Sequence, residues 1–431
     1  MDLIYENAEL TIVAACGHDA DAGLPGVHEG ARLGPTFSGE IIPGVELGGY
    51  MTLDQRMRRS MYSSRGWTVP RFQEELLSTR SLFFVDELVY FRCRSTTLFE
   101  FFDAALDSRI TEENISSDPT SLLPGAMQLD YPLFDFQTFL ICYTRRSLAN
   151  QEDALNAMGG FIQRVSRTMK CRFIEGLPAA IFDLFILFRN RSVSLRRRHG
   201  FPSYSWAGWK GGVDFEHVDD VNRWLDTSTW IVWYTRSARG TLDLVWDIPA
   251  NEDFPYDDSE CVGYRRRGEF QSPMTLPFDT SRTQPTEGLH SAMPALNYPV
   301  LQFWTLSAFF NIRVANNVEN LAFIIDMFGA TCGALYLDDR EGSTFFGSAG
   351  PYELIAVSGS CESELAFWVD RMTSSLPEFQ ELFDSECYYN VMVLMWSDGL
   401  AERRGIGFAR QEDFITKSLL PGVYWKEIVL G

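Results

Sequence analysis

The second half of the chain is a succession of short apolar runs, and this pattern limits the fold more than any other feature. The runs are rich in β-branched and aromatic residues, which predicts β-strands. They are Trp230–Tyr234, Leu242–Trp246, Leu301–Val314, Leu321–Asp326, Glu353–Val357, Tyr389–Trp396 and Tyr424–Leu430. Apolar residues alternate from Leu306 to Val314, as on one face of a half-buried strand. We therefore expect a β-rich region over residues 200–431, with Asp398-Gly399 as a hairpin turn.

The middle of the chain, residues 96–199, has helical periodicity instead. The apolar stretch Phe134–Tyr143 predicts one helix. Asn150 is a candidate N-cap for a second helix. Apolar residues then recur every three or four positions, at Leu155, Met158, Ile162, Val165 and Met169. Pro178 can open a third helix that runs to Phe188.

The first apolar run, Leu10–Cys16, predicts a strand that is buried on both faces. Such a strand needs neighbours, and the few residues before it cannot supply them, so residues 1–95 are expected to form an incomplete domain. Two apolar runs around Asp86-Glu87 predict a β-hairpin over Ser81–Cys93. Residues 247–299 are rich in Pro, Asp, Ser and Thr, which predicts an irregular insertion. The whole pattern favours an α+β protein.

The charge of the chain limits its partners. It has 37 Lys and Arg residues against 58 Asp and Glu residues, for a formal net charge of −21. Such a surface repels phosphate, so nucleic acid and anionic membranes are disfavoured as partners. The longest apolar stretch, Leu177–Phe188, is shorter than the roughly 20 residues that cross a bilayer. No membrane span is therefore expected.

Cysteine and histidine usage indicates neither a metal site nor secretion. The 8 cysteines are scattered without a C-x-x-C pair, and the 5 histidines have no metal-ligand spacing. Acidic residues interrupt the first 16 positions, where a secretory signal would have a basic and then an apolar region. These features favour a reduced, cytoplasmic protein without a bound cofactor.

The segment from Arg65 to Arg80 is the densest in polar functional groups. Glu74 or Glu75 can line a polar pocket together with Arg80. The alternative is a helix N-terminus, where acidic residues interact favourably with the helix dipole. The alternative is favoured, so Glu74 and Glu75 are only weak catalytic candidates.

Two other segments have competing interpretations. Trp206 and Trp209, in Pro202–Trp209, can form a platform on which a sugar or a base stacks, or they can pack tightly in a core. The basic run Arg196-Arg197-Arg198 can be a nuclear-localisation or phosphate-binding patch. The alternative is a loop whose arginines are solvated or pair with internal carboxylates, and in both segments the structural interpretation is favoured.

Several motifs resemble one family. Those near the start are Tyr5-Glu6-Asn7-Ala8, Thr11-Ile12, Ala14-Ala15 and Gly23-Leu24-Pro25-Gly26-Val27. The next are Arg65-Gly66-Trp67-Thr68 and Phe72–Ser78, followed by Arg80, Phe83-Phe84 and Cys93. Later ones are Asp153–Ala157 with Gly160, Gly200–Trp209, Tyr389–Met392, Ala401–Gly407 and Trp425–Ile428. Together they resemble fungal heterokaryon-incompatibility (HET-domain) proteins over most of the chain.

The resemblance implies functions and boundaries. It implies self/non-self recognition that leads to programmed cell death, through protein partners or self-association. It also implies a truncated α/β, TIR-like remnant over residues 1–95, and family-motif residues Arg65, Gly66, Trp67, Gln73, Glu74 and Arg80. A TIR-like NAD hydrolase that uses Glu74 or Glu75 is the alternative function.

This sequence departs from the family pattern in two places. The opening motifs of the HET domain are absent, so residue 1 corresponds to a position well inside that domain. Val69-Pro70-Arg71 also interrupts the closing motif, where proline bends or delays a helix. We therefore expect an N-terminally truncated member, which is either a signalling or interaction module or an inactive fragment.

Overall fold

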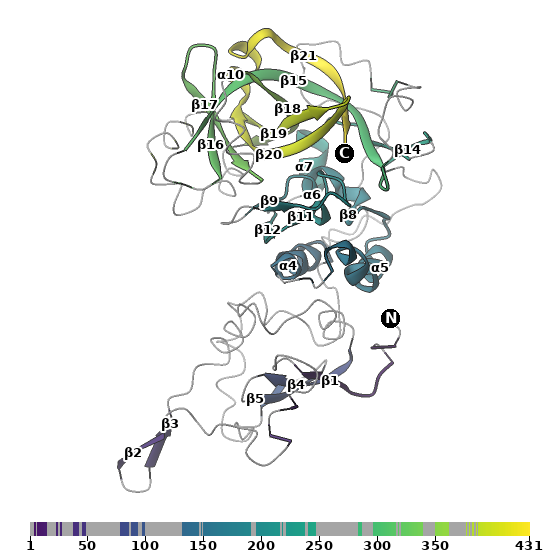
Figure 1. Ribbon diagram of the computed structural model, residues 1–431, viewed down its shortest axis with the longest axis vertical. Helices are drawn as coiled ribbons and strands as arrows, with labels where there is room; N and C mark the ends of the chain where they lie inside the picture. Colours follow the sequence, from purple (N-terminus) through teal and green to yellow (C-terminus); the bar gives the residue numbers. More distant parts are fainter. Residues whose placement is uncertain are drawn as a thin grey trace. The chain divides into compact units, whose positions relative to one another are not determined.

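The computed structural model divides the chain into two units (Figure 1). Unit 1 comprises Met1–Asp130 and Arg146–Val165, and unit 2 comprises Tyr131–Arg145 and Ser166–Gly431. The structure describes residues 4–5, 7–14, 23–24, 26–27, 38–42, 45–48, 78–85, 88–93, 97–99, 132–145, 148, 150–190, 195–215, 218, 221–237, 240–246, 283–286, 296–315, 318, 320–338, 350–361, 376, 379, 382, 385 and 387–431. These units differ from the segments predicted to end at residues 95 and 199, because the helix over 132–144 groups with the C-terminal region.

Unit 1 contains a four-stranded sheet in the order β1-β4-β5-β6. Its strands are β1 (Thr11–Ala14), β4 (Arg80–Val85), β5 (Leu88–Cys93) and β6 (Thr97–Phe99), and β2 (Ser38–Ile42) pairs with β3 (Val45–Gly48) as a separate hairpin. The predicted hairpin is confirmed, since β4 and β5 pair from Arg80 with Cys93 to Val85 with Leu88. The rings of Phe83 and Tyr90, which are register partners, stack at 4.5 Å.

The first strand is less buried than its sequence predicts. β1 runs parallel to β4, and among the residues that the structure describes it pairs with no other strand. Thr11 and Val13 are buried, and the Ser78 hydroxyl donates to Thr11 Oγ1 at 2.7 Å. Ile12 on the opposite face is 56% exposed, so the prediction of burial on both faces is wrong for the described strand.

The predicted helix after Asn150 begins as two short 3₁₀ turns. These are η1 (Gln151–Asp153) and η2 (Asn156–Met158), and α5 (Gly159–Thr168) follows. Asn150 is the expected cap, because its side chain accepts from the Glu152 N–H. The buried stripe includes Phe161 rather than the predicted Ile162, because the 3₁₀ turns shift the helical phase.

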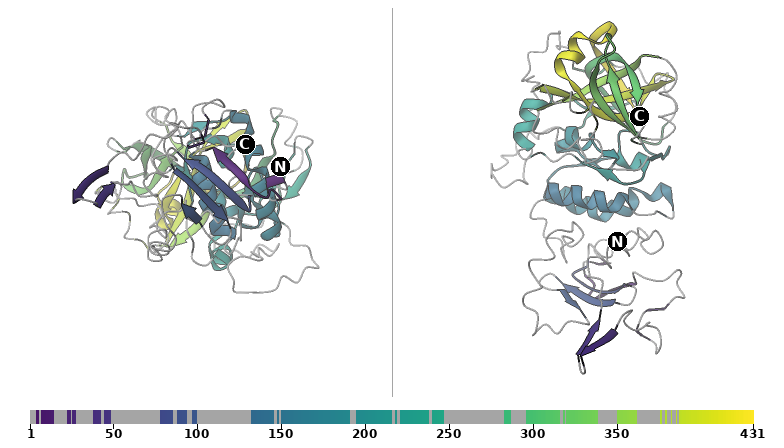
Figure 2. Two further views of the ribbon diagram at one scale, coloured as in Figure 1. Left: turned by 90° about the horizontal axis from the view of Figure 1, so that it is seen from below. Right: turned by 90° about the vertical axis from the view of Figure 1, so that its left-hand side faces the viewer.

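Unit 2 has three layers, which Figures 1 and 2 show as a barrel, a group of short strands around α6, and helix α4. The helices are α4 (Pro132–Thr144), η3 (Ala179–Ile181), α6 (Phe182–Phe185), η4 (Trp206–Gly208), α7 (Val221–Ser228) and α10 (Gln411–Thr416). The short strands are β7 (Phe173–Ile174), β8 (Leu177–Pro178), β9 (Arg189–Asn190), β10 (Arg196–Arg197), β11 (Trp209–Lys210) and β12 (Val213–Asp214). Thr144 at the end of α4 accepts from the Val213 N–H at 3.1 Å, which joins α4 to the layer of short strands.

The barrel is a nine-stranded, largely antiparallel sheet whose pairings return to β15. Its strands are β13 (Tyr234–Arg236), β14 (Leu242–Leu244), β15 (Val300–Val314), β16 (Leu321–Ile325), β17 (Thr331–Leu337), β18 (Tyr352–Cys361), β19 (Cys387–Ser397), β20 (Leu400–Arg410) and β21 (Leu419–Leu430). The path β15-β16-β17-β20-β19-β18 closes because β18 also pairs with β15. β21 lies along β15 and meets β20 at Leu430. Strands predominate over helices in the described residues, which agrees with an α+β class.

The long strand β15 corrects one prediction. The expected apolar face over Leu306–Phe310 is buried, but the other face is buried too, and alternation appears only beyond Phe309. Polar residues on that second face are satisfied internally. Thr305 donates to the Ala356 carbonyl at 2.5 Å, and Ser307 donates to Glu353 at 2.5 Å.

Two further predictions differ from the structure. Trp230 and Ile231 are buried but not in a strand, which begins only at Tyr234. The helix predicted from Pro178 to Phe188 is a 3₁₀ turn followed by the four residues of α6. Every residue from Leu177 to Asn190 is buried. Apolar periodicity therefore could not mark where the helix ends and the strand begins.

Small residues allow the barrel strands to approach closely. A Cβ at Gly407 would lie 1.9 Å from the Ala334 carbonyl oxygen of β17. Any side chain at Gly407 would therefore separate the two strands. This requirement explains why the Ala401–Gly407 segment has glycine at this position.

Candidate functional site

Most of the predicted site residues lie outside the described residues. These are Arg65, Gly66, Trp67, Gln73, Glu74 and Glu75, and the Val69-Pro70-Arg71 insertion lies there too. Arg80 is described: it is exposed, begins β4 and pairs with Cys93. The pocket predicted for Glu74 or Glu75 with Arg80 therefore stays a prediction.

The aromatic segment Pro202–Trp209 forms part of the core of unit 2. Trp206 and Trp209 are both 0% exposed. Trp206 Nε1 donates to the Gly176 carbonyl at 2.9 Å, and Trp209 Nε1 donates to the Ser203 carbonyl at 2.8 Å. Because neither ring faces solvent, stacking of a sugar or base on them is excluded, and the core-packing interpretation is confirmed.

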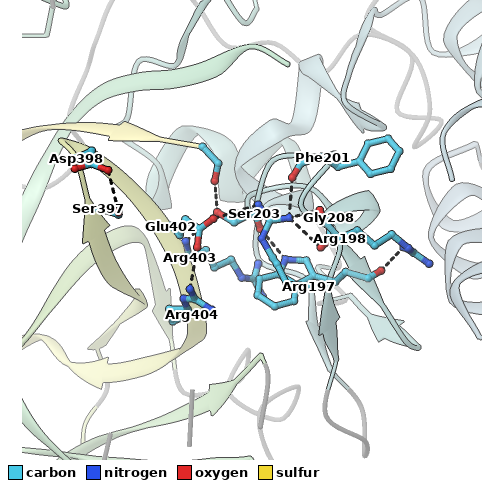
Figure 3. Close-up of polar contacts among 12 residues, drawn as sticks. Arg197, Arg198, Phe201, Ser203, Gly208, Ser397, Asp398, Glu402, Arg403 and Arg404 are labelled. Carbon is cyan, nitrogen blue, oxygen red and sulfur yellow. Dashed lines mark hydrogen bonds and ion pairs between the residues drawn. The ribbon is translucent and has the colours of Figure 1, made fainter. Parts of the chain in front are cut away.

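Arg197 joins this segment to the barrel (Figure 3). Its Nη1 donates to the carbonyls of Arg198, Phe201 and Gly208 at 2.5, 2.7 and 3.1 Å. Its Nη2 lies 3.5 Å from Glu402 Oε1. Burial lowers the pKa of Arg197, and the Glu402 carboxylate partly offsets that effect. A Cβ at Gly208 would lie 2.2 Å from the Pro202 carbonyl, so glycine is needed where the loop folds under Arg197.

The other two arginines of the basic run have different surroundings. Arg198 donates to the carbonyls of Ala207 and Trp209, and burial lowers its pKa. Arg196 is exposed. Two of the three guanidinium groups are thus occupied by internal oxygens, mainly carbonyls, and do not form a continuous phosphate-binding surface.

Arg403 of β20 and Asp338, the residue after β17, form a bidentate ion pair. Arg403 Nε lies 2.8 Å from Asp338 Oδ2 and its Nη2 lies 3.0 Å from Oδ1, with both side chains fully buried. The same guanidinium donates to the carbonyls of Ile186 and Phe188. The main-chain N–H of Arg403 donates to Ser203 Oγ at 2.9 Å. Arg403 therefore connects the barrel to the segment after α6 through its side chain, and to the aromatic segment through its main chain.

The turn at Glu175-Gly176 has the most unusual conformation near these residues. It connects β7 to β8, and both residues have positive φ, 48° and 82°. Two-residue turns of this kind favour Asn, Asp or Gly, so a glutamate is strained there. The turn is held by the aromatic segment, because Ser205 Oγ donates to the Glu175 carbonyl at 2.5 Å.

The surroundings of the Glu175 side chain disfavour its charged form. Burial raises the pKa of Glu175 above its ordinary value of 4.5. Burial, followed by the Glu175 charge, raises the pKa of Tyr204, whose hydroxyl donates to the Pro299 carbonyl at 2.7 Å. Burial also raises the pKa of Tyr298. Strained backbone and perturbed titratable groups concentrate at functional sites, so Glu175 is a candidate acid–base residue.

Substitution of Glu175 by Gln is expected to stabilise the protein at neutral pH. The raised pKa means that the folded state binds a proton more tightly than the unfolded state. The stability linked to this proton is complete below pH 4.5 and is lost as the pH rises through the folded-state pKa. Urea unfolding of wild type and Glu175→Gln should therefore give curves that coincide at pH 4 and separate at pH 7. A Glu412→Gln control, which removes an exposed carboxylate of α10, should not separate from wild type in this way.

The buried carboxylate of Glu353 accepts four hydrogen bonds within the barrel. It accepts from Ser307 Oγ at 2.5 Å, from Trp396 Nε1 at 2.6 Å, and from Lys426 Nζ at 2.7 and 2.9 Å. The Lys426 ammonium also lies 4.5 Å from the centroid of the Trp396 ring. These contacts join β15, β18, β19 and β21, so the cluster supports the barrel.

Apolar side chains are exposed at the turn between β16 and β17. Met327 is 48% exposed, Phe328 is 75% exposed and Leu420, near the start of β21, is 89% exposed. Met327 N–H donates to the Lys417 carbonyl at 3.0 Å, which fixes the turn against the segment that leads to Leu420. We call these three residues the 328 patch.

The turn that presents Phe328 is rigidly braced. Asp326 Oδ1 accepts from the N–H groups of Phe328 and Ala330, both at 2.8 Å. The Asp326 N–H donates to the Ala330 carbonyl at 2.9 Å. Phe328 is therefore held outward in one conformation of the backbone, which lowers the entropy that binding would cost.

Within the part of the chain that the structure describes, no group of three or more His, Cys, Asp and Glu residues is arranged to hold a metal ion. None of its helices is long and apolar enough to cross a bilayer.

Sequence reasoning missed Glu175 and the 328 patch. The signal for Glu175 was an Ile-Glu-Gly-Leu sequence between two apolar pairs, with a side chain that two-residue turns disfavour. The signal for the patch was Met327-Phe328-Gly329, two large apolar residues and a glycine directly after the predicted strand Leu321–Asp326. Neither feature can be compared with a relative, because no family model, no curated protein and no solved structure matches the chain.

Proposed function

We propose that the chain is a signalling module of the heterokaryon-incompatibility type, which acts by binding proteins through the 328 patch. The patch is the observation that carries this proposal. Single exposed apolar residues are ordinary. Here Met327 and Phe328 lie on one braced turn, and Leu420 follows Lys417, whose carbonyl accepts a hydrogen bond from that turn. Aromatic residues held in this way are typical of the energetic centre of protein interfaces.

The family resemblance supports the same proposal. Its later motifs coincide with the framework of unit 2: Trp206 and Trp209 are buried, and Arg403 makes the bidentate pair with Asp338. Gly407 allows two barrel strands to touch. The resembling residues thus have demanding structural roles, as residues that define a fold would.

The start of the chain supports an α/β remnant of the TIR-like kind. β1 and β4 are parallel, and a parallel pair requires a long crossover connection of the kind found in α/β domains. The antiparallel strands β5 and β6 extend the same sheet. In this proposal unit 1 contributes to assembly with other proteins.

The proposal is tested by inducible expression in a filamentous fungus. Wild type is expected to arrest growth, and a Phe328→Ser/Leu420→Ser variant is expected to lose at least about 90% of that effect, since hot-spot truncations cost about 2 kcal/mol or more. Colony growth is the measurement. Equal arrest by both proteins at equal abundance would contradict the proposal.

Two controls make this comparison specific. Both substituted side chains are largely exposed, so the variant should unfold at the same urea concentration as wild type. The alternative, NAD hydrolysis, predicts that cellular NAD falls and that a Glu74→Gln/Glu75→Gln variant restores it. The binding proposal expects NAD to stay constant during the arrest.

A further inference from the structure

Two cysteines occupy paired positions at one end of the barrel. β18 ends at Cys361 and β19 begins at Cys387, and these residues are register partners in the antiparallel β18–β19 ladder. Cys387 is exposed and is a free cysteine in the structure. The proximity follows from the backbone register and does not depend on the 328 patch.

The backbone spacing suits a disulfide. Directly paired residues in antiparallel strands have Cα atoms about 4.5 or 5.5 Å apart, depending on the hydrogen-bonding pattern. Disulfides span Cα separations of about 4.4–6.8 Å, so both spacings are within range. Paired positions also lie on the same face of a sheet.

Other described cysteines are in different surroundings. Burial raises the pKa of Cys171 to about 11, and burial raises the pKa of Cys332 as well. Thiols of this kind stay protonated and react slowly. Exposure therefore distinguishes Cys387 from these two buried thiols.

We propose that Cys361 and Cys387 form a reversible disulfide when the protein is oxidised by a peroxide. One thiolate attacks a peroxide oxygen, which gives a sulfenic acid and releases water after protonation. The second thiolate attacks that sulfur, so the S–S bond forms and a second water leaves. In total the two thiols lose two electrons and two protons, and hydrogen peroxide is reduced to two waters. A dithiol reductant reverses the bond by thiol–disulfide exchange.

The disulfide would link the start of β19 to the end of β18. Tyr388, the next residue, packs its ring 5.9 Å from that of Phe408, and its hydroxyl donates to the Leu382 carbonyl at 2.8 Å. Ser385 Oγ donates to the Cys387 carbonyl at 3.2 Å. Closing the loop between Cys361 and Cys387 restricts the unfolded chain, so oxidation is expected to raise the midpoint of thermal unfolding.

Peptide mapping of the full chain tests the proposal. The reduced protein is treated with hydrogen peroxide, free thiols are blocked with N-ethylmaleimide, and trypsin is added without reductant. Arg371 lies between the two cysteines, so they are released in separate peptides. The expected result is a linked pair of these peptides that separates on reduction.

Variants identify the two sulfur atoms. Cys361→Ser and Cys387→Ser should each abolish the linked pair, whereas a Cys93→Ser control should retain it. Detection of Cys387 as a sulfinic or sulfonic acid with Cys361 still alkylated would overturn the proposal. A bond from Cys387 to any other cysteine, or to a second chain, would overturn it too. The wild-type map decides the question even where a variant fails to fold.

Discussion

Replacement of Arg403 by Met is expected to lower the free energy of unfolding by about 3–5 kcal/mol, the usual cost of breaking a buried ion pair. The substitution leaves the Asp338 carboxylate fully buried without its bidentate partner. It also removes the donors to the Ile186 and Phe188 carbonyls. Urea unfolding followed by tryptophan fluorescence measures the loss.

The neighbouring arginine provides the matched control. Arg404 lies on the same strand and pairs with Glu402, but both side chains are partly exposed. Arg404→Met should therefore change the free energy of unfolding by only about 0–1 kcal/mol. An Arg403→Met/Asp338→Leu variant should recover part of the loss, because no unpaired carboxylate remains. Equal effects of Arg403→Met and Arg404→Met would show that the buried pair does not stabilise unit 2.

Replacement of Trp206 by Ala is expected to cost about 3–5 kcal/mol, as for other buried aromatic residues. The ring is 0% exposed and packs edge-on against Tyr143 of α4, with centroids 5.6 Å apart. Its Nε1 also holds the strained turn through the Gly176 carbonyl. The expected consequence is loosening of both α4 and the turn, measured as loss of amide hydrogen-exchange protection.

A Trp206→Phe variant separates packing from hydrogen bonding. Phe keeps most of the ring but cannot donate to Gly176, so the expected cost is about 1–3 kcal/mol for a buried carbonyl left without its donor. Its exchange protection should fall at the Glu175-Gly176 turn and persist in α4. Uniform loss in both places would mean that the hydrogen bond has no separate role.

The sequence was a good guide where one face of an element is buried and turns are marked. The β4–β5 hairpin is an example, because Asp86-Glu87 separates two apolar runs of similar length. It was a poor guide where all faces are buried. Leu177–Phe188 is apolar throughout, so no period shows that only Phe182–Phe185 is α-helical.

The sequence did not predict the barrel strand β17, because close packing requires small residues there. β17 contains Cys332, Gly333 and Ala334, small residues with weak strand propensity. A Cβ at Gly333 would lie 2.3 Å from the Phe408 carbonyl, so the neighbour that demands glycine is more than 70 residues away in the sequence. Such a tertiary requirement overrides local propensity and cannot be read from the strand alone.

The candidate site shows the same limits. Burial of Trp206 and Trp209 was favoured from the small residues between them, and the structure confirms it. The desolvation of Glu175 depends on the packing of residues distant in sequence, which no local pattern encodes. Exposure of Phe328 likewise depends on what the rest of the chain leaves uncovered.

Photo-cross-linking in living cells most directly tests the proposed binding of protein through the 328 patch. A benzophenone amino acid is placed at position 328 or, as a control, at the exposed position Thr227 of α7. We expect a discrete protein adduct from position 328 and none from position 227. The same adducts from both positions, or no adduct from position 328 in cells whose growth the chain arrests, would contradict it.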